Sequence, residues 1–210
     1  MMLPLLVVAL LWLGGCFHLI TVVGAIVGGD SATADEFPHM AVLGRSCLQA
    51  DGGDCVDGYE WFCGGTLISD RFVLTAAHCA HTGMSHPPTV VQLVEDPSMI
   101  LQRVQIPIVP NSQCNQLLYR SRRLRHGVLP SQLCAGDPNG GKDTCEGDSG
   151  GPLQLKLPSA RPIGQAYRYY VVGITSNGGI CGTVDRPGLY TRVSSYAGWI
   201  DQVLEQITPD

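Results

Sequence analysis

The sequence predicts an all-β protein, and three observations support this fold class. Short apolar runs alternate with turns rich in glycine and proline, of which the chain contains 26 and 14, a pattern typical of β-barrels or sandwiches rather than helical bundles. Hydrophobic residues make up 45% of the chain, which is enough for a real core. The length of 210 residues fits one domain or two fused halves, because a β-barrel can reach about 200–250 residues as one unit.

Seven segments have the composition of short strands, because each is rich in β-branched or aromatic residues and is bounded by Gly, Pro, Asn or Asp. In chain order they are Gly65–Ile68, Phe72–Ala76, Val90–Val94, Leu101–Val109, Pro152–Leu157, Tyr169–Thr175 and Gly188–Arg192. The polar turn 69–71 joins the first two segments. We find no internal repeat and no low-complexity linker.

One helix is predicted at the carboxyl end. Apolar residues recur there at helical spacing behind two candidate caps, Ser194 and Ser195. The apolar positions are Tyr196, Trp199, Ile200, Val203, Leu204 and Ile207. We expect this apolar face to serve structural packing.

Residues 1–25 have the composition of a secretory signal peptide. They contain no Lys, Arg, Asp or Glu, and an apolar run over Leu3–Leu13 precedes the small residues Val23-Gly24-Ala25, which are typical of a cleavage site. A membrane anchor is the alternative, since about 20 apolar residues can cross a bilayer. Gly14-Gly15 and His18 interrupt the run, which favours removal after Ala25 and an extracellular, secreted protein.

The cysteine count agrees with secretion. Cys16 would leave with the signal peptide, and eight cysteines remain, an even number that predicts four disulfides in a secreted chain. A zinc site is the alternative, but no C-x-x-C or paired His/Cys spacing supports it, so we expect neither a metal nor another cofactor. The net charge of −5 argues against nucleic acid as a partner.

The segment 120–126 is compositionally unusual, because it holds four arginines within six residues between Cys114 and Cys134. It is either an anion-binding loop, a protease-sensitive site, or a solvated loop closed by a disulfide, and the sequence favours the solvated loop.

Two segments carry residues typical of nucleophilic catalysis. Thr75-Ala-Ala-His78-Cys79 follows an apolar strand, and Gly147-Asp148-Ser149-Gly150-Gly151-Pro152 precedes another. A serine between glycines can lie on a sharp turn with backbone N–H groups facing a developing oxyanion. A histidine is suited to act as its general base, because its pKa lies near working pH.

These segments resemble those of the chymotrypsin-like (trypsin-type) serine proteases. Ile26-Val-Gly-Gly29 resembles their mature amino terminus, Cys63-Gly-Gly-Thr-Leu-Ile68 and Leu74–Cys79 the histidine hairpin, and Asp143–Leu153 the nucleophile loop. Val172–Ser176 and Pro187–Val193 resemble the walls of the primary specificity pocket. Cys47 and Cys55 before Tyr59-Glu-Trp-Phe, together with Pro130–Asp137, are most similar to the catalytic chains of arthropod clip-domain cascade proteases. No clip module is present in this sequence.

The resemblance implies a fold of two antiparallel six-stranded Greek-key barrels with a C-terminal helix, formed by residues 26–207. It implies that Ser149 is the nucleophile, that His78 is its base and later the acid, and that the N–H groups of Gly147 and Ser149 form the oxyanion hole. Asp148 would pair with the freed amine of Ile26. The primary pocket would be formed by Asp143 at its base with Ser176, Gly178 and Gly188 on its walls, where a buried carboxylate selects Arg or Lys. Asn177 departs from the aromatic residue common at that position.

The expected disulfide pairs join cysteines that are near in sequence. They are Cys47–Cys55, Cys63–Cys79, Cys114–Cys134 and Cys145–Cys181.

The third member of the catalytic triad, a buried Asp, is not found. In the family template this Asp lies about 45 residues after the His and about 93 before the Ser. Counting from His78 reaches Arg123, and counting back from Ser149 reaches Val56. Only 71 positions separate His78 from Ser149, against about 138 in the template. We therefore predict that a block of some sixty-odd residues is missing.

The seam of this deletion is predicted near 95–99, which leaves the first barrel and the crossing between barrels incomplete. Glu95 and Asp96 are the only acids between Cys79 and Cys134. Asp96 is thus the one remaining candidate for the triad, although it precedes Pro97 in a predicted turn.

Two function classes follow from these residues. The first is a secreted endopeptidase that cuts protein or peptide substrates after Arg or Lys and is a target of protease inhibitors. In the shortened form given by this sequence, it would have little activity. The second is a non-catalytic homologue that binds and regulates within a proteolytic cascade. A product that never folds is a third alternative, and the natural substrate is not indicated.

Overall fold

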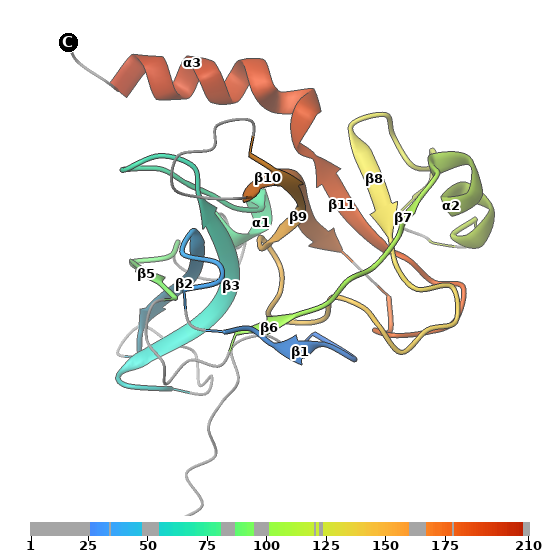
Figure 1. The fold of residues 1–210 in the computed structure, drawn as a ribbon, viewed down its shortest axis with the longest axis horizontal. Helices are drawn as coiled ribbons and strands as arrows, with labels where there is room; N and C mark the ends of the chain where they lie inside the picture. The colour runs from blue at the N-terminus through green and yellow to red at the C-terminus, as the bar shows by residue number, and fades with distance from the viewer. Residues whose placement is uncertain are drawn as a thin grey trace, which may run out of the picture.

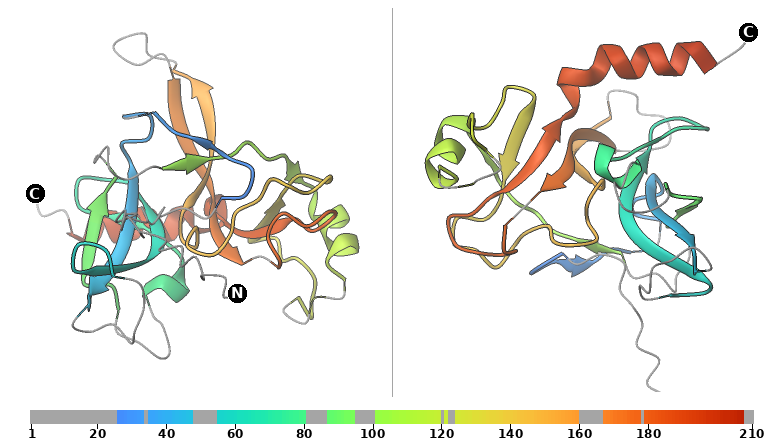
Figure 2. Two further views of the ribbon diagram at one scale, coloured as in Figure 1. Left: turned by 90° about the horizontal axis from the view of Figure 1, so that it is seen from below. Right: turned by 180° about the vertical axis from the view of Figure 1, so that it is seen from behind.

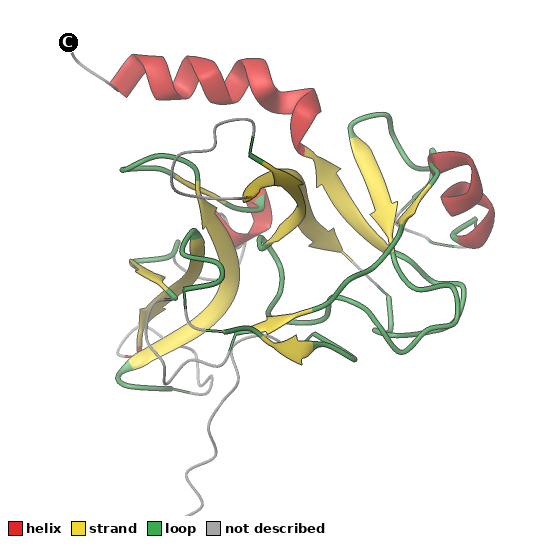
Figure 3. Cartoon of the chain, viewed as in Figure 1, coloured by secondary structure: helices red, strands yellow, loops and turns green. Residues whose placement is uncertain are grey.

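The structure is a computed structural model that describes residues 26–33, 35–47, 55–80, 87–94, 101–119, 121, 124–159, 167–177 and 179–207. The predicted signal peptide (1–25), the predicted seam (95–99), Asp96 and Gly178 lie outside the described residues. Strands dominate the described part, as predicted (Figure 3). No described helix has both the length and the apolar character that a membrane span requires.

The first half of the chain forms a four-stranded antiparallel sheet with the order β4-β3-β2-β5 (Figure 1). Its strands are β2 (Met40–Ser46), β3 (Tyr59–Leu67), β4 (Val73–Leu74) and β5 (Val90–Leu93). The short helix α1 (Ala77–Ala80) follows β4.

The second half forms a five-stranded antiparallel sheet with the order β7-β8-β11-β10-β9. Its strands are β7 (Ile108–Val109), β8 (Gln132–Ala135), β9 (Pro152–Pro158), β10 (Tyr167–Asn177) and β11 (Gly188–Arg192). Both main sheets are curled, and β9 and β10 form a long hairpin that extends away from the rest of the sheet (Figure 2, left). Helix α2 (Asn111–Leu117) connects β7 to the segment before β8.

A small two-stranded sheet joins the amino-terminal segment to the start of the second half. It pairs β1 (Asp30–Ser31) with β6 (Gln102–Arg103). Leu101–Val109 is therefore not the single strand that its composition predicts. Its two ends pair with different partners, β1 at one end and β8 at the other, and residues 104–107 cross between them without belonging to a strand.

The carboxyl-terminal helix forms where it is predicted, with Ile200, Val203 and Leu204 partly buried, but the start of its predicted apolar face is exposed. Helix α3 (Ala197–Ile207) follows a 3₁₀ turn, Val193–Tyr196, so Ser194 and Ser195 lie in this turn and do not cap α3. The helix lies outside both sheets (Figures 1 and 2). Tyr196 is 42% exposed and Trp199 is 57% exposed. The expected packing role is thus wrong for Tyr196 and Trp199, which no described segment covers.

All four predicted disulfides are present. The structure joins Cys47 to Cys55, Cys63 to Cys79, Cys114 to Cys134, and Cys145 to Cys181. Cys63, Cys79, Cys114 and Cys134 are among the most buried residues of the two sheets. One small apolar core includes the Cys63–Cys79 disulfide and also Ile174 of β10, so it joins the two halves. A second core, within the second half, includes the Cys114–Cys134 disulfide.

One buried polar group in the first sheet lacks a partner. Thr66 in β3 is fully buried, and its hydroxyl forms no hydrogen bond. A buried hydroxyl without a partner costs free energy, because its hydrogen bonds to water are not replaced. By contrast, the hydroxyl of Thr75 donates to the carbonyl oxygen of Gly64 at 2.8 Å.

We predict that Thr66→Val raises the free energy of unfolding, by about 1 kcal/mol, because it removes the unpaired hydroxyl and keeps the branched shape. The matched change Thr75→Val should lower it by about 1–3 kcal/mol, because it leaves the Gly64 carbonyl without its donor. Urea unfolding followed by fluorescence measures both. Equal destabilisation by the two changes would show that Thr66 is hydrogen-bonded in solution.

Candidate functional site

His78 lies on the one-turn helix α1, directly after the first sheet. Its neighbour Cys79 is fully buried and bonded to Cys63 of β3, and the Cys79 N–H donates to the carbonyl of Ala76 at 2.9 Å. The disulfide thus fixes the helix to the sheet, while the His78 side chain is exposed. The sequence TAAHC produces this arrangement, because the small residues Ala76 and Ala77 allow the turn to lie close to the strand ends.

Ser149 lies in a tight loop over Cys145–Gly151. The Asp148 N–H donates to the Cys145 carbonyl (3.2 Å), and the Cys145 N–H donates to Oδ2 of Asp148 (2.8 Å). Gly147 and Gly150 have φ of 92° and 81°, values that L side chains rarely adopt. Among the described residues, the N–H groups of Gly147 and Ser149 have no acceptor. Two unpaired donors beside a half-buried serine are what an oxyanion requires.

The histidine and serine segments are held against each other by backbone contacts. The Gly64 N–H of β3 donates to the Ser149 carbonyl (2.8 Å), and the Gly150 N–H donates to the Thr175 carbonyl of β10 (2.8 Å). Sγ of Cys79 lies 3.5 Å from the Ser149 carbonyl oxygen. A Cβ atom at Gly150 would lie only 2.2 Å from Oγ1 of Thr75 and 2.5 Å from the Gly64 carbonyl oxygen. The structure therefore brings together segments 70 residues apart.

The His78 ring itself is unpaired. Within the described part of the chain, the structure shows no hydrogen bond between His78 and Ser149, and no carboxylate bonded to the His78 ring. A nitrogen of His78 and the sulfurs of Cys63 and Cys79 lie within 4.8 Å of one another. The two sulfurs are bonded in a disulfide, so they are not thiolates that hold a metal.

Asp143 is a buried carboxylate without a cationic partner. It is 4% exposed; Oδ1 accepts from the Thr144 N–H (2.9 Å) and Oδ2 from the Gly182 N–H (3.0 Å). Burial raises the pKa of Asp143, although these two backbone donors oppose the effect. Among the described residues no Lys, Arg or His forms an ion pair with it. A buried charge of this kind favours a cationic ligand.

Gly188 lies close to this carboxylate. A Cβ atom at Gly188 would lie 3.4 Å from Oδ1 of Asp143 and 3.2 Å from the ring of Tyr190. The hydroxyls of Tyr190 and Thr144 are 3.0 Å apart. Burial is the largest cause that raises the pKa of Tyr190, so the hydroxyl of this fully buried residue stays neutral.

Ser176 is half-buried near the end of β10, where the pairing of β10 with β11 slips between Thr175 and Asn177. Gly178, the next predicted wall residue, lies outside the described residues. The sequence prediction missed Thr144 and Gly182 as donors to Asp143, because any residue type can supply a backbone N–H. It also missed Gly64 as the donor to Ser149.

The amino-terminal segment lies beside Asp143. Val27 and Asp143 exchange backbone hydrogen bonds of 3.0 and 3.2 Å. Gly28 has a φ of 66°, and a Cβ atom there would lie 2.0 Å from the Gly141 carbonyl oxygen, so only glycine fits this approach. Ile26 is half-buried at this point. The amino terminus of the predicted mature chain thus lies next to the loop that carries Asp143 and Asp148.

Comparison with known proteins agrees with this geometry. The family model described as Trypsin matches residues 26–96 and 92–200. "Serine protease snk" of Drosophila melanogaster is 31% identical over 254 positions, which cover 85% of this chain and 56% of the relative. "Serine protease Hayan" of the same organism is 28% identical over 261 positions, covering 85% and 39%. "Clotting factor G beta subunit" of Tachypleus tridentatus is 39% identical over 107 residues, covering 50% and 32%.

The chain spans from about a third to just over half of the length of these relatives. The family match covers most of the chain and includes both the His78 segment and the Ser149 segment. With the fold and the paired segments described above, this shows that the chain belongs to the trypsin family of chymotrypsin-like serine proteases.

Proposed function

We propose that this chain is built to hydrolyse peptide bonds after Arg or Lys, and that the buried, unpaired carboxylate of Asp143 determines this choice. A substrate guanidinium or ammonium group would supply a positive charge beside Asp143. This would recover part of the free energy lost when the carboxylate was buried. Gly188 supports the proposal, because its lack of a side chain leaves room next to Oδ1 of Asp143.

In the proposed reaction Ser149 attacks the scissile carbonyl carbon while His78 accepts the proton from its hydroxyl. The free N–H groups of Gly147 and Ser149 stabilise the oxyanion that forms. His78 then protonates the leaving amine, and water releases the acyl group from Ser149. The backbone contacts between Gly64, Ser149 and Gly150 support these roles, because they hold the two segments at one place.

We further propose that an internal block of the family fold is missing from this chain. The alignment with snk runs over 254 positions, whereas 85% of a 210-residue chain is only about 179 residues. About 75 aligned positions of the relative therefore have no counterpart here. The two family-model segments also meet at 92–96, close to the seam predicted near 95–99.

Two features of the fold support the same proposal. Strand β5 pairs only with β2 among the described residues, and Val91 on this edge is 49% exposed, whereas proteins normally protect such edges. Helix α3 also leaves Tyr196 and Trp199 uncovered. The triad Asp would belong to the missing block, so the chain as it stands should hydrolyse substrates very slowly. Asp96 stays a candidate substitute.

The Asp143 site is tested by the binding of benzamidine, an aryl amidine that mimics an arginine side chain, because binding does not require catalysis. Calorimetry should detect binding to the chain and a loss of at least about 100-fold for Asp143→Ser, since the cation then has no counter-charge in a buried site. Asp201→Ser on the exposed face of α3 is the matched control and should bind normally.

Because the pKa of Asp143 is raised, the affinity for benzamidine should also depend on pH. As the pH falls, Asp143 becomes protonated earlier than an ordinary aspartate, and the affinity for the amidine should fall in that range. Affinity that is unchanged by Asp143→Ser would overturn the proposed preference for Arg and Lys.

The amino terminus is a second test. We propose that cleavage after Ala25 releases the signal peptide and frees the Ile26 amine to pair with Asp148, without a separate activating protease. Sequencing of secreted protein should therefore begin at Ile-Val-Gly-Gly-Asp. An upstream start would show that another processing step is needed. An Ile26→Gly variant that is cleaved at the same bond would show whether the Ile26 side chain is needed for the amine to pair with Asp148, independently of the cleavage itself.

A further inference from the structure

The arginine-rich segment between Cys114 and Cys134 is not used by the proposed reaction. The structure places its last arginine, Arg125, with His126 at the corner of a tight turn, and both side chains are exposed. The Gly127 N–H closes this turn on the Leu124 carbonyl at 3.0 Å, and Gly127 has a φ of 73°. Within the described part of the chain, Arg125 has no ion pair.

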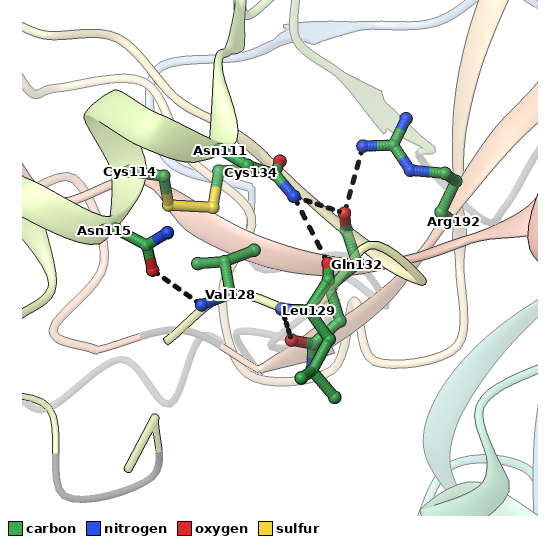
Figure 4. Close-up of a disulfide and its surroundings, with 8 residues drawn as sticks. All are labelled: Asn111, Cys114, Asn115, Val128, Leu129, Gln132, Cys134 and Arg192. Carbon is green, nitrogen blue, oxygen red and sulfur yellow. Dashed lines mark hydrogen bonds between the residues drawn. A yellow bond between two sulfur atoms is a disulfide. The ribbon is translucent and has the colours of Figure 1, made fainter. Parts of the chain in front are cut away.

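The base of this loop is fixed much more strongly than its tip. The Cys114–Cys134 disulfide closes the loop, and Oδ1 of Asn115 accepts from the Val128 N–H at 2.6 Å (Figure 4). Nδ2 of Asn111 donates to the carbonyls of Leu129 and Gln132 at 3.2 and 3.1 Å. Val128 is buried against the disulfide. The chain on the carboxyl side of the turn is therefore anchored from Val128 onward.

A second anchor comes from the neighbouring strand. Arg192 of β11 donates through its guanidinium to the carbonyl of Gln132 at 3.0 Å (Figure 4). It also donates to the carbonyl of Pro130 at 2.9 Å. The side chain of Gln132 in turn accepts from the Leu129 N–H at 3.0 Å. None of these contacts involves the turn at Arg125.

Among the described residues, the backbone hydrogen bonds of the tip are local. The described backbone hydrogen bonds between Leu118 and Gly127 each span three residues: Ser121 to Leu118, Leu124 to Ser121, and Gly127 to Leu124. Leu124 is the partly buried side chain that ties the tip to the core. Opening the tip breaks these few contacts and leaves the base intact, which is the condition for local unfolding at low free-energy cost. Exposed loop tips of this kind are the preferred sites of proteolytic nicking.

From this asymmetry we propose that the Arg125–His126 peptide bond is a processing site for an arginine-specific endopeptidase, and that the cut chain stays folded and covalently joined. Hydrolysis breaks the C–N bond between the two residues. Water supplies the oxygen of the new Arg125 carboxylate, and the nitrogen of His126 becomes a new amino terminus. The Cys114–Cys134 disulfide spans the cut, whereas the other three disulfides lie wholly on one side of it.

The test treats the purified full chain with a limiting amount of active trypsin and follows the products on gels with and without reductant. The first cut should yield a new amino terminus that begins His-Gly-Val-Leu. The two pieces should migrate together without reductant and separate with it. The cut protein should also keep a cooperative thermal unfolding transition.

Arg125→Gln should abolish the fragment that begins at His126 and slow the first cut. Arg168→Gln is the matched control, because Arg168 is also exposed but is paired with Leu157 within the β9–β10 hairpin, and it should leave the cut unchanged. A first cut elsewhere, a wild-type rate for Arg125→Gln, or pieces that separate or unfold without reductant would overturn the proposal.

Discussion

At Gly150 the backbone of the second half lies so close to the first half that no side chain fits between them. A Cβ atom there would overlap Oγ1 of Thr75 and the Gly64 carbonyl, and it would lie 3.1 Å from the disulfide sulfur of Cys79. The positive φ of Gly150 turns its N–H toward Thr175 of β10. This contact determines where the Ser149 loop lies relative to helix α1. Ser149 directly precedes Gly150, and His78 directly precedes Cys79, which lies against Gly150.

The charge of Asp143 imposes the second constraint on the site. Two backbone donors and a buried position fix the carboxylate, but they do not neutralise it. Its backbone also pairs with Val27, so the amino-terminal segment and the proposed specificity site share one stretch of chain. A change in the amino-terminal segment should therefore affect the Asp143 site, and the reverse, since Val27 and Asp143 are joined by direct hydrogen bonds.

Much of the fold was predictable from sequence, and the exceptions have physical causes. The roles of the site residues stay predictions. The four disulfides and the segment Gly188–Arg192 were predicted correctly. An even cysteine count in a secreted chain predicts disulfides but not which cysteines pair, so the pairing depended on the resemblance to the protease family. Strands β2 and β8 and helix α2 were missed, and Leu101–Val109 was predicted as one strand. These elements depend on partners distant in sequence, as the pairing of β8 with both β7 and β11 shows.

The exposed face of α3 is the most informative disagreement. Its periodicity predicts a helix that packs against the body, yet Trp199 is exposed, and β5 pairs with β2 alone among the described residues. Both observations fit a chain from which an internal block is missing. A homologue that binds without cutting would show the same fold and the same Asp143 site, so only catalysis separates the two functions.

The most direct test compares this chain with a form that carries a family-type segment between Glu95 and Ile100. The measurement is kcat/KM on an arginine ester and an arginine amide, with Ser149→Ala in both forms as the background. Because loss of the triad Asp costs about 10⁴ in kcat in the family template, we expect the restored form to be faster by a factor of that order. Near-equal activity of the two forms would contradict the account.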